Sequence, residues 1–470
     1  MGTFFCAYII YQMVEAMANG IEDRLIDGLS FKLAPGASYI TDRRSVTFHP
    51  QGSNIYSSQS GTKLIRIAIT GDHWLDPSTF RISYELSNTD TNVAHRLRPL
   101  VSPWAFFRRL RVLVGGQLVE DIDYYNRVHQ MFSLLIAKES CQNNQAEAFG
   151  YQSTEPRDLA TTYQLSGIAG NQAQVVLFKP LCGLLSQNKY LPIRYMPLTL
   201  ELELVTNPLD PICDPAMDAT DNFTADNTST SWVIQNVQVK CDMCTLDNAL
   251  DNSYAQHLLS GRSLPINYDT WVSQFQAISG QAPIVNITRA LTRLKSVFVT
   301  FDKDFTDARR VKFFRKQWND FYSPACLDSI TTAAGTVYGN HNGSFVFNKT
   351  SELEIQLQVG SKLFPEYPIR THSEAYYQLQ KALGIQSSNL HNFNINGVEY
   401  RDNKFIVGFD TEKVIEAGWT GMNTRSGDLL TVKMKYDPAC PVAQQADRIH
   451  IILHSDQILE IRDSGCQVFD

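Results

Sequence analysis

The sequence has no apolar run long enough to cross a membrane and no excess of positive charge. Its most continuously apolar stretch, residues 4–17, has about 14 residues and includes Glu15, whereas a membrane-spanning helix needs roughly 20 apolar residues. The 41 Lys and Arg residues against 48 Asp and Glu give a formal net charge of -7, which disfavours attraction of the whole protein to nucleic acid or to an anionic membrane. With 43% hydrophobic residues, the 470-residue chain has the composition of a folded globular protein of two or three domains.

Paired cysteines and catalytic motifs are also missing. The nine cysteines are scattered and odd in number, which is typical of free thiols in a reducing compartment. Cys241 and Cys244 form a C-x-x-C, but no second pair follows at zinc-finger spacing, and residues three apart on a strand point to opposite faces. No H-E-x-x-H, G-x-S-x-G or P-loop occurs. We therefore expect no catalytic residues, no metal site and no cofactor.

What the sequence does contain is a succession of segments in which apolar and polar residues alternate. Leucine alternates with threonine or glutamate over residues 198–204, and residues 353–359 and 430–436 show the same period of two. This period indicates strands that bury one face. Because such strands must pack sheet against sheet, we expect an all-β antiparallel sandwich or barrel rather than an α/β fold. Further strand candidates are residues 45–48, 64–70, 80–86, 110–114, 175–178, 297–301, 405–409 and 449–453.

The same pattern occurs twice, in the same order. Residues 114–118 (VGGQL) end one strand, turn at glycine and begin another, and residues 359–363 (VGSKL) do the same 245 positions later. Each turn is followed by a helix candidate, at residues 124–137 and 372–383. Strands near residues 198–202 and 233–243 correspond to strands near 430–434 and 448–459, at offsets of 232 and about 216. The falling offset places extra residues in two polar loops of the first half, 139–172 and 206–231.

Two copies of about 200 residues predict two tandem eight-stranded antiparallel jelly rolls, with short helices in the inter-strand loops and an N-terminal helical arm. The predicted boundaries are residues 1–38 for the arm, 39–250 for the first jelly roll, and 251–470 for the second jelly roll with its connecting segment. In the arm, the spacing of Tyr8, Ile9, Met13 and Met17 favours an amphipathic helix. This helix either covers the base of its own chain or packs on a neighbouring subunit.

The turn at residues 114–118 with its following helix, the stretch His49-Pro50-Gln51-Gly52-Ser53-Asn54 before the strand at 64–70, and the tandem repeat resemble a double jelly-roll major capsid protein. The resemblance is to those of polinton-like viruses and virophages, in the lineage that includes adenovirus hexon. It covers nearly the whole chain after the arm. It rests mainly on length, the order of elements and the duplication, because the individual motifs are short.

The resemblance implies a non-enzymatic structural protein of the virion, assembled in the cytoplasm or nucleus of a host cell. It implies a homotrimer whose six jelly rolls form a pseudo-hexagonal capsomer in an icosahedral capsid. The implied partners are the chain itself, neighbouring capsomers, penton and minor capsid proteins, and an internal membrane or the genome. No specific small-molecule ligand is expected.

One acidic segment is a candidate exposed loop. No basic residue lies between Arg194 and Lys240, and the segment lacks glycine and any EF-hand pattern, so a solvated loop is favoured over a calcium site. On the implied capsid fold it is an exposed tower. Its acidic residues are Asp210, Asp214, Asp218, Asp221 and Asp226.

Two clusters combine arginine with aromatic residues and are candidates for subunit contacts, with phosphate or genome binding as the alternative. The first places Trp104, Phe106 and Phe107 beside Arg108, Arg109 and Arg111. The second comprises Arg309, Arg310, Phe313, Phe314 and Trp318, and the apolar arm adds Phe4, Phe5, Tyr8 and Ile9. Asp121 and Asp123 are interpreted as turn formers and helix N-caps ahead of Tyr124.

An alternative from a different class is a tandem jelly-roll carbohydrate-binding protein or glycan hydrolase, since the same sandwich hosts such activities. That function predicts exposed aromatic residues with convergent carboxylates in one set of loops.

Overall fold

The computed structural model of the chain describes residues 39–57, 63–99, 102–137, 140, 147–149, 167–212, 229–303, 321–324, 329–332, 335–338, 353–385, 395, 397, 400, 404–412, 421–425, 429–436, 438, 442 and 445–470. Contacts between residues divide the chain into two compact units, Met1–Thr41 and Asp42–Asp470. The predicted N-terminal arm lies outside the described residues. None of the helices in the described ranges has the length and hydropathy needed to cross a membrane.

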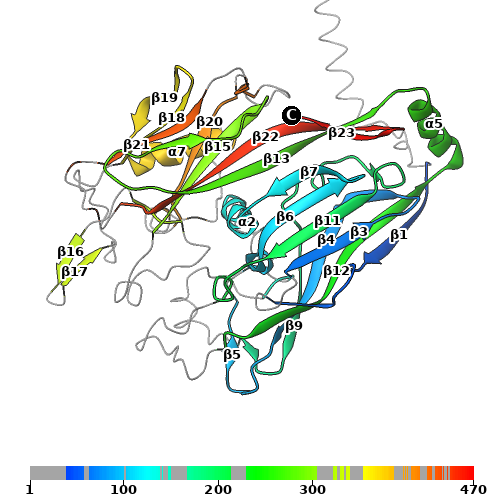
Figure 1. The fold of residues 1–470 in the computed structure, drawn as a ribbon, viewed down its shortest axis with the longest axis horizontal. Coiled ribbons are helices and arrows are strands. Elements are labelled where there is room, and N and C mark those ends of the chain that lie inside the picture. Colours follow the sequence, from blue (N-terminus) through cyan, green and yellow to red (C-terminus); the bar gives the residue numbers. More distant parts are fainter. Residues whose placement is uncertain are drawn as a thin grey trace, which may run out of the picture. The chain divides into compact units, whose positions relative to one another are not determined.

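The first half of the described chain forms two facing antiparallel sheets (Figure 1). One has the order β1 (Ile40–Phe48), β12 (Trp232–Leu246), β4 (Trp74–Asn88), β10 (Leu191–Pro192), with β2 (Ile55–Tyr56) on β12 and β9 (Ala173–Phe178) on β4. The other has the order β3 (Leu64–Ile69), β11 (Leu198–Leu204), β6 (Phe107–Val114), β7 (Gln117–Ile122). A small sheet pairs β5 (Arg96–Leu97) with β8 (Ile168–Ala169), and the 3-10 helix η1 (Pro103–Phe106) precedes β6.

The second half repeats this arrangement. One sheet has the order β13 (Leu264–Ala277), β22 (Arg448–Arg462), β15 (Leu294–Asp302), β20 (Ile406–Asp410), and β23 (Gly465–Phe469) extends it from β22. The other has the order β14 (Ile284–Ile287), β21 (Leu430–Tyr436), β18 (Leu353–Val359), β19 (Lys362–Ile369). A separate hairpin joins β16 (Ser329–Thr332) and β17 (Gly335–Tyr338).

Both halves have the strand order of a jelly roll. If the eight principal strands of each half are numbered along the chain, one sheet reads 1-8-3-6 and the other 2-7-4-5, in both halves. The predicted fold class, two tandem antiparallel jelly rolls, is therefore confirmed. We call the halves the first and second jelly roll; the exact domain boundaries stay a prediction.

The repeated hairpin and helix are also confirmed. Gly115 and Gly116, with φ of +56° and +85°, form the tight turn between β6 and β7, and Gly360, with φ of +58°, lies in the equivalent turn between β18 and β19. Helix α2 (Tyr125–Leu134) follows β7, and α7 (His372–Ala382) follows β19. Helix α7 begins with a capping box between Thr371 and Glu374.

The prediction that Asp121 and Asp123 cap the first helix is wrong. Helix α2 begins after Tyr124, which has φ of +48° and no side-chain cap. Asp121 instead lies on β7 and is ion-paired with Arg109 at 2.6 Å. The Asp123 carboxylate accepts a hydrogen bond from the backbone N–H of Tyr124, ahead of the helix.

Several elements were not predicted from the sequence. One is the helix α5 (Asn248–Leu259), which is capped by Asp247 and connects the last strand of the first jelly roll to β13. Two others are β13 and β14, the first two strands of the second jelly roll. Along β13 half of the residues are half-buried and polar residues occur on both sides of the strand, so its sequence lacks a clear period of two.

Candidate functional site

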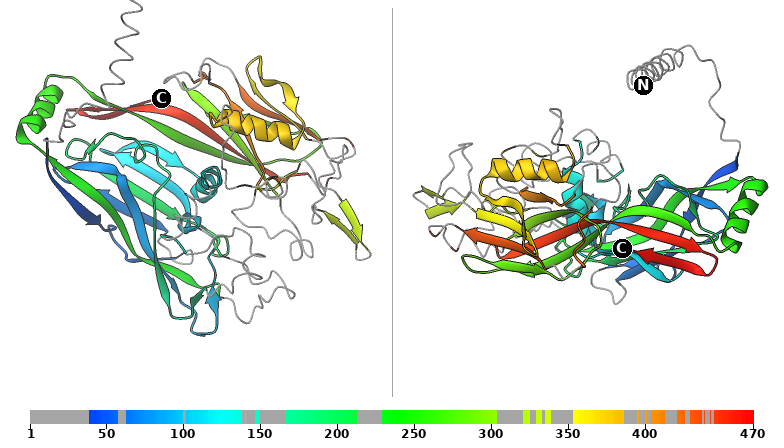
Figure 2. Two further views of the ribbon diagram at one scale, coloured as in Figure 1. Left: turned by 180° about the vertical axis from the view of Figure 1, so that it is seen from behind. Right: turned by 90° about the horizontal axis from the view of Figure 1, so that it is seen from above.

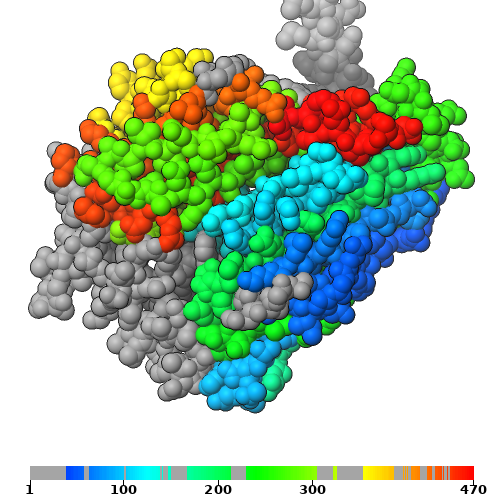
Figure 3. Space-filling view, viewed as in Figure 1, coloured from blue at the N-terminus to red at the C-terminus, as the bar shows by residue number. Residues whose placement is uncertain are grey.

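The contact between the two jelly rolls joins their buried apolar residues into one cluster. Strand β7 and helix α2 of the first jelly roll pack against β13, β15 and β22 of the second (Figures 1 and 2). In the space-filling view the cyan residues of the first jelly roll lie directly beside the green and red residues of the second (Figure 3). We call this contact the seam.

Aromatic side chains form the apolar part of the seam. The ring of Phe132 on α2 lies 5.6 Å from Trp271 on β13 and 5.3 Å from Phe298 on β15, measured between ring centroids. Tyr124, just before α2, stacks on Phe275 of β13 at 4.8 Å. Such pairs contribute about 0.5–1.5 kcal/mol each beyond the apolar area that they bury.

A buried arginine crosses the seam. Arg127 on α2 is only 1% exposed, and its Nη2 donates a hydrogen bond to the carbonyl oxygen of Phe301 on β15 at 3.0 Å. Its guanidinium also lies 4.9 Å from the centroid of the Phe321 ring. Burial, together with the positive charge of Arg127, lowers the pKa of His450 well below its usual value, so this buried imidazole is neutral.

A buried carboxyl group joins β7 to both jelly rolls. Glu120 accepts hydrogen bonds from the backbone N–H groups of Gly183 at 2.9 Å and Leu184 at 3.2 Å, and from the thiol of Cys182 at 2.5 Å. The side chain of Thr270 on β13 adds a hydrogen bond from the second jelly roll. Burial raises the pKa of Glu120 to about 7, although these donors favour the charged form and oppose the rise.

The two backbones approach closely beside this carboxyl group. A Cβ atom on Gly183 would lie 1.4 Å from the carbonyl oxygen of Asp269 on β13, so only glycine fits there. Hydroxyl groups of β13 reach the unpaired edge of β7: Tyr268 Oη lies 3.2 Å from the carbonyl oxygen of Val119, and Ser273 Oγ donates to that of Asp123. The seam thus covers an edge strand that would otherwise be open.

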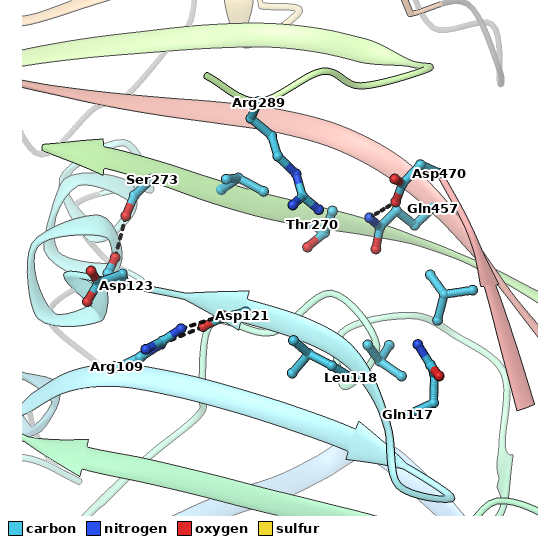
Figure 4. Close-up of a pocket in the computed structure, with 13 residues that line it drawn as sticks. Arg109, Gln117, Leu118, Asp121, Asp123, Thr270, Ser273, Arg289, Gln457 and Asp470 are labelled. Atoms are coloured by element: carbon cyan, nitrogen blue, oxygen red, sulfur yellow. Dashed lines mark hydrogen bonds and ion pairs between the residues drawn. The ribbon is translucent and has the colours of Figure 1, made fainter. Parts of the chain in front are cut away.

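A cleft of about 440 Å³ opens along the seam (Figure 4). On one side the Arg109 and Asp121 ion pair lies on β6 and β7, and on the other Arg289 points toward the cleft. Arg289 makes no ion pair with any residue that the structure describes. At the far end Asp470 is paired with Arg425 at 2.5 Å. The cleft is polar and of mixed charge, and its paired carboxylates form no acid–base couple.

A second group of ionisable side chains surrounds Lys295 on β15. Its Nζ lies 3.0 Å from Asp269 Oδ1 and 3.2 Å from Asp456 Oδ1. Burial and the neighbouring Asp269 raise the pKa of Asp456 to about 6. The nearby Trp271 is packed between Phe132 and His454, so it is not the open aromatic platform that the carbohydrate alternative predicts.

Part of the first predicted contact cluster proves to be core. Phe106 and Phe107 are 0% exposed and pack around Tyr84 and Phe178, so they cannot supply surface to another subunit, and that part of the prediction is wrong. Trp104 is half-buried and stacks on His129 at 3.9 Å. Both phenylalanines bridge the end of η1 and the start of β6, where the alternation of β6 has not yet begun.

The three arginines of that cluster are each paired with a carboxylate, which reduces the positive charge that they offer to a phosphate. Arg108 is paired with Asp123 at 3.6 Å, Arg109 with Asp121 at 2.6 Å, and Arg111 with Glu201 at 2.9 Å. Each positive charge is therefore offset by a neighbouring carboxylate. The sequence does not reveal these partners, because they lie on β7, on β11 and in the turn before α2, whereas the arginines lie on β6.

Among the acidic loop residues, Asp210 is half-buried and accepts a hydrogen bond from the Asn207 side chain at 2.9 Å. Cys241 and Cys244 are buried free thiols on β12, and the described residues contain no group of three side chains able to hold a metal ion. The remaining candidates lie outside the described residues: Phe4, Phe5, Tyr8, Ile9, Asp214, Asp218, Asp221, Asp226, Arg309, Arg310, Phe313, Phe314 and Trp318.

No protein-family model and no curated protein matches this sequence. Solved structures do match. VP54 of PBCV-1, fitted into a reconstruction of the virophage Sputnik, has a TM-score of 0.55 and 12% identity, covering 94% of this chain and 99% of that chain. The PBCV-1 virus capsid gives 0.54 and 12%, with the same coverage, and the Faustovirus major capsid protein gives 0.54 and 9%, covering 92% of each chain.

These likenesses extend over both jelly rolls in their order along the chain. The fold is therefore a double jelly roll, the fold of these proteins, reached here with a largely different sequence.

Proposed function

We propose that this chain is a major capsid protein, a structural component of the virion that assembles as a homotrimer into an icosahedral shell. One observation carries the proposal: the entire double jelly roll, rather than one sandwich alone, is shared with the capsid proteins of PBCV-1 and Faustovirus. A sandwich on its own hosts many functions, so a single jelly roll would not support this choice.

The duplication gives this function a physical basis. Three copies of a chain that holds two similar sandwiches place six similar units around a threefold axis. Such a trimer has a nearly hexagonal outline and tiles a hexagonal lattice with one kind of subunit. The seam supports this proposal because it fixes the two sandwiches to each other by a buried ion, a buried carboxyl group and a glycine contact.

The finer features follow from the same proposal. The chain acts through self-association rather than catalysis, and its partners are other capsomers, penton and minor capsid proteins. Contact with a genome or an internal membrane is assigned to residues other than Arg108, Arg109 and Arg111, because those three are already paired with carboxylates.

The test is the mass and outline of the purified protein. Light scattering after gel filtration is expected to give three times 53.1 kDa, and negative-stain micrographs are expected to show threefold particles of hexagonal outline. A monodisperse monomer at micromolar concentration, with no particles in the micrographs, would contradict the proposal.

A further inference from the structure

Two helices in equivalent places of the repeat are covered to very different extents. Eight of the ten residues of α2 are buried, because the first jelly roll covers one side and the second jelly roll covers the other. Only three of the eleven residues of α7 are buried. Its inner face lies on β20, where Gly408 approaches Leu379 and Ala382 closely enough that a Cβ would clash.

The outer face of α7 is exposed together with the preceding strand. Tyr377 on α7 is 53% exposed and Tyr367 on β19 is 81% exposed. The equivalent hairpin strand of the first jelly roll, β7, is covered by β13. Large exposed tyrosines are enriched where proteins meet, since the ring buries apolar area while the hydroxyl stays hydrogen-bonded.

The surface that covers α2 also has an equivalent elsewhere in the chain. Helix α2 and the segment before it pack on the outer face of the β13-β22-β15 sheet, through Trp271, Phe275 and Phe298. In the first jelly roll the matching surface is the outer face of the β1-β12-β4 sheet. In Figure 1, β12 and β4 lie on the opposite side of the two jelly rolls from α7 and β19.

We propose that the outer face of α7 and β19 docks on the outer face of the β12 and β4 strands in a second copy of this chain, repeating between subunits the contact that the seam makes within one. This inference rests on the proposed function, because it names the surface through which the trimer closes. Two different patches on opposite sides of one chain make a heterologous contact, which generates a ring when the rotation closes.

The contact between copies differs from the seam in its chemistry. The outer row of β4 carries the half-buried Arg81 and Glu85 on either side of the buried Ser83, and β12 adds the exposed Lys240, whereas the corresponding row of β15 includes Phe298. The seam is accordingly aromatic where α2 packs on β13 and β15, while the contact between copies is polar. Association of subunits is therefore expected to weaken as ionic strength rises, under conditions that leave each subunit folded.

Photo-crosslinking tests the location of the contact. Tyr377 is replaced by p-benzoylphenylalanine in the full chain, the assembled protein is irradiated, and crosslinked peptides are identified by mass spectrometry. The expected partner peptide lies within residues 74–88 or 232–246 of another copy. Crosslinks to any other segment of the partner copy would overturn the inference while leaving the proposed function intact.

A double substitution tests how much the proposed contact contributes to subunit association. Tyr367→Glu with Tyr377→Glu is expected to weaken subunit association about ten-fold or more. The melting temperature of the dissociated subunit is expected to stay within about 2 °C of wild type, because both side chains are exposed. The matched control is Val93→Glu, on a residue that is 62% exposed in the loop between β4 and β5.

The possible failures are distinguishable. If the wild type and the double variant assemble equally well, the inference is wrong and the capsid function stands. If the wild type is itself a monomer that forms no particles and no crosslink between copies, both the inference and the proposed function are wrong. If Val93→Glu disrupts assembly as strongly as the tyrosine pair, the effect is not specific to α7 and β19 and the inference is overturned.

Discussion

Arg127 donates a hydrogen bond to the carbonyl oxygen of Phe301 at 3.0 Å, and this bond connects α2 of the first jelly roll to β15 of the second. A buried charge is costly without hydrogen-bond acceptors, so Arg127 tolerates few alternative arrangements of its surroundings. The bond thus contributes to holding the two sandwiches in one relative position.

Replacing Arg127 by methionine keeps much of the side-chain volume but removes the charge-assisted hydrogen bond and leaves the Phe301 carbonyl oxygen without this donor. The free energy of unfolding is expected to fall by about 2 kcal/mol, measured by denaturant titration. Arg66→Met is the control, because Arg66 is 54% exposed and lies 3.7 Å from Glu201, a surface pair worth at most about 1 kcal/mol. An Arg127→Met protein as stable as wild type would show that the buried bond gives no net stabilisation.

Gly183→Ala is expected to disrupt the seam. The added methyl would lie 1.4 Å from the carbonyl oxygen of Asp269, a backbone atom that cannot move aside without shifting β13. The expected loss is at least about 3 kcal/mol in the free energy of unfolding, followed by thermal or denaturant unfolding. Gly397→Ala, where nothing lies within 4 Å of the added Cβ, is expected to have little effect. Equal stability of the two variants would refute the close contact.

The raised pKa of Glu120 is expected to make the free energy of unfolding depend on pH. Its pKa is raised in the folded protein from 4.5 to about 7, so the folded state binds the proton more tightly than the unfolded state. The stabilisation is fully present below pH 4.5 and is lost as the pH rises through about 7. Glu120→Gln is therefore expected to gain stability relative to wild type across this interval. The readout is the denaturation midpoint of both proteins at each pH, and a constant difference between them would contradict the prediction.

Two buried histidines also make the stability of the wild-type protein depend on pH. The contribution of Glu120 therefore has to be measured as the difference between wild type and Glu120→Gln. Burial lowers the pKa of His129 from 6.5 to about 3 and that of His450 well below its usual value. Their contribution is present above pH 6.5 and is lost as the pH falls, which is opposite in sign to that of Glu120. The pH profile of wild type alone thus sums opposing slopes, and the difference between wild type and Glu120→Gln isolates the carboxyl group.

The described cysteines are expected to react slowly in the native state. Cys182, Cys241 and Cys244 are buried, and burial raises the pKa of each thiol and so reduces its thiolate. Alkylation at pH 8, mapped by peptide mass spectrometry, is expected to be at least about ten-fold slower at these positions in native protein than in urea. Cys466, which is half-buried, is expected to react first among the four. Rapid native labelling of Cys182 would contradict the packed seam.

Alternation along the strands made much of the fold predictable. Residues 198–204, 353–359 and 430–436 carry a period of two because each faces solvent or polar neighbours on one side and a core on the other. Strand β13 was missed because both of its sides take part in contacts, some with its own jelly roll and some with α2 and β7. A strand used on both faces loses the signal that a one-sided strand keeps.

The site was much less predictable than the fold. Phe106 and Phe107 have the composition of an interface anchor, and only their burial shows that they belong to the core. Conversely, Glu120 and Arg127 are charged residues that composition assigns to the surface, yet they are 1% exposed. Their partners, Thr270 and Phe301, lie 150 and 174 positions further along the chain.

The sequence by itself determined the class of fold, its duplication and the paired hairpin and helix, since these depend on patterns within a few neighbouring residues. The tertiary structure decided which equivalent surfaces are used. It covers α2 and leaves the outer face of α7 open, although both helices occupy the same place in the repeat. The physical reason is that a surface becomes buried only when a segment distant in the sequence packs against it. One chain with two sandwiches forms only one contact between them, so only one of the two equivalent surfaces is covered.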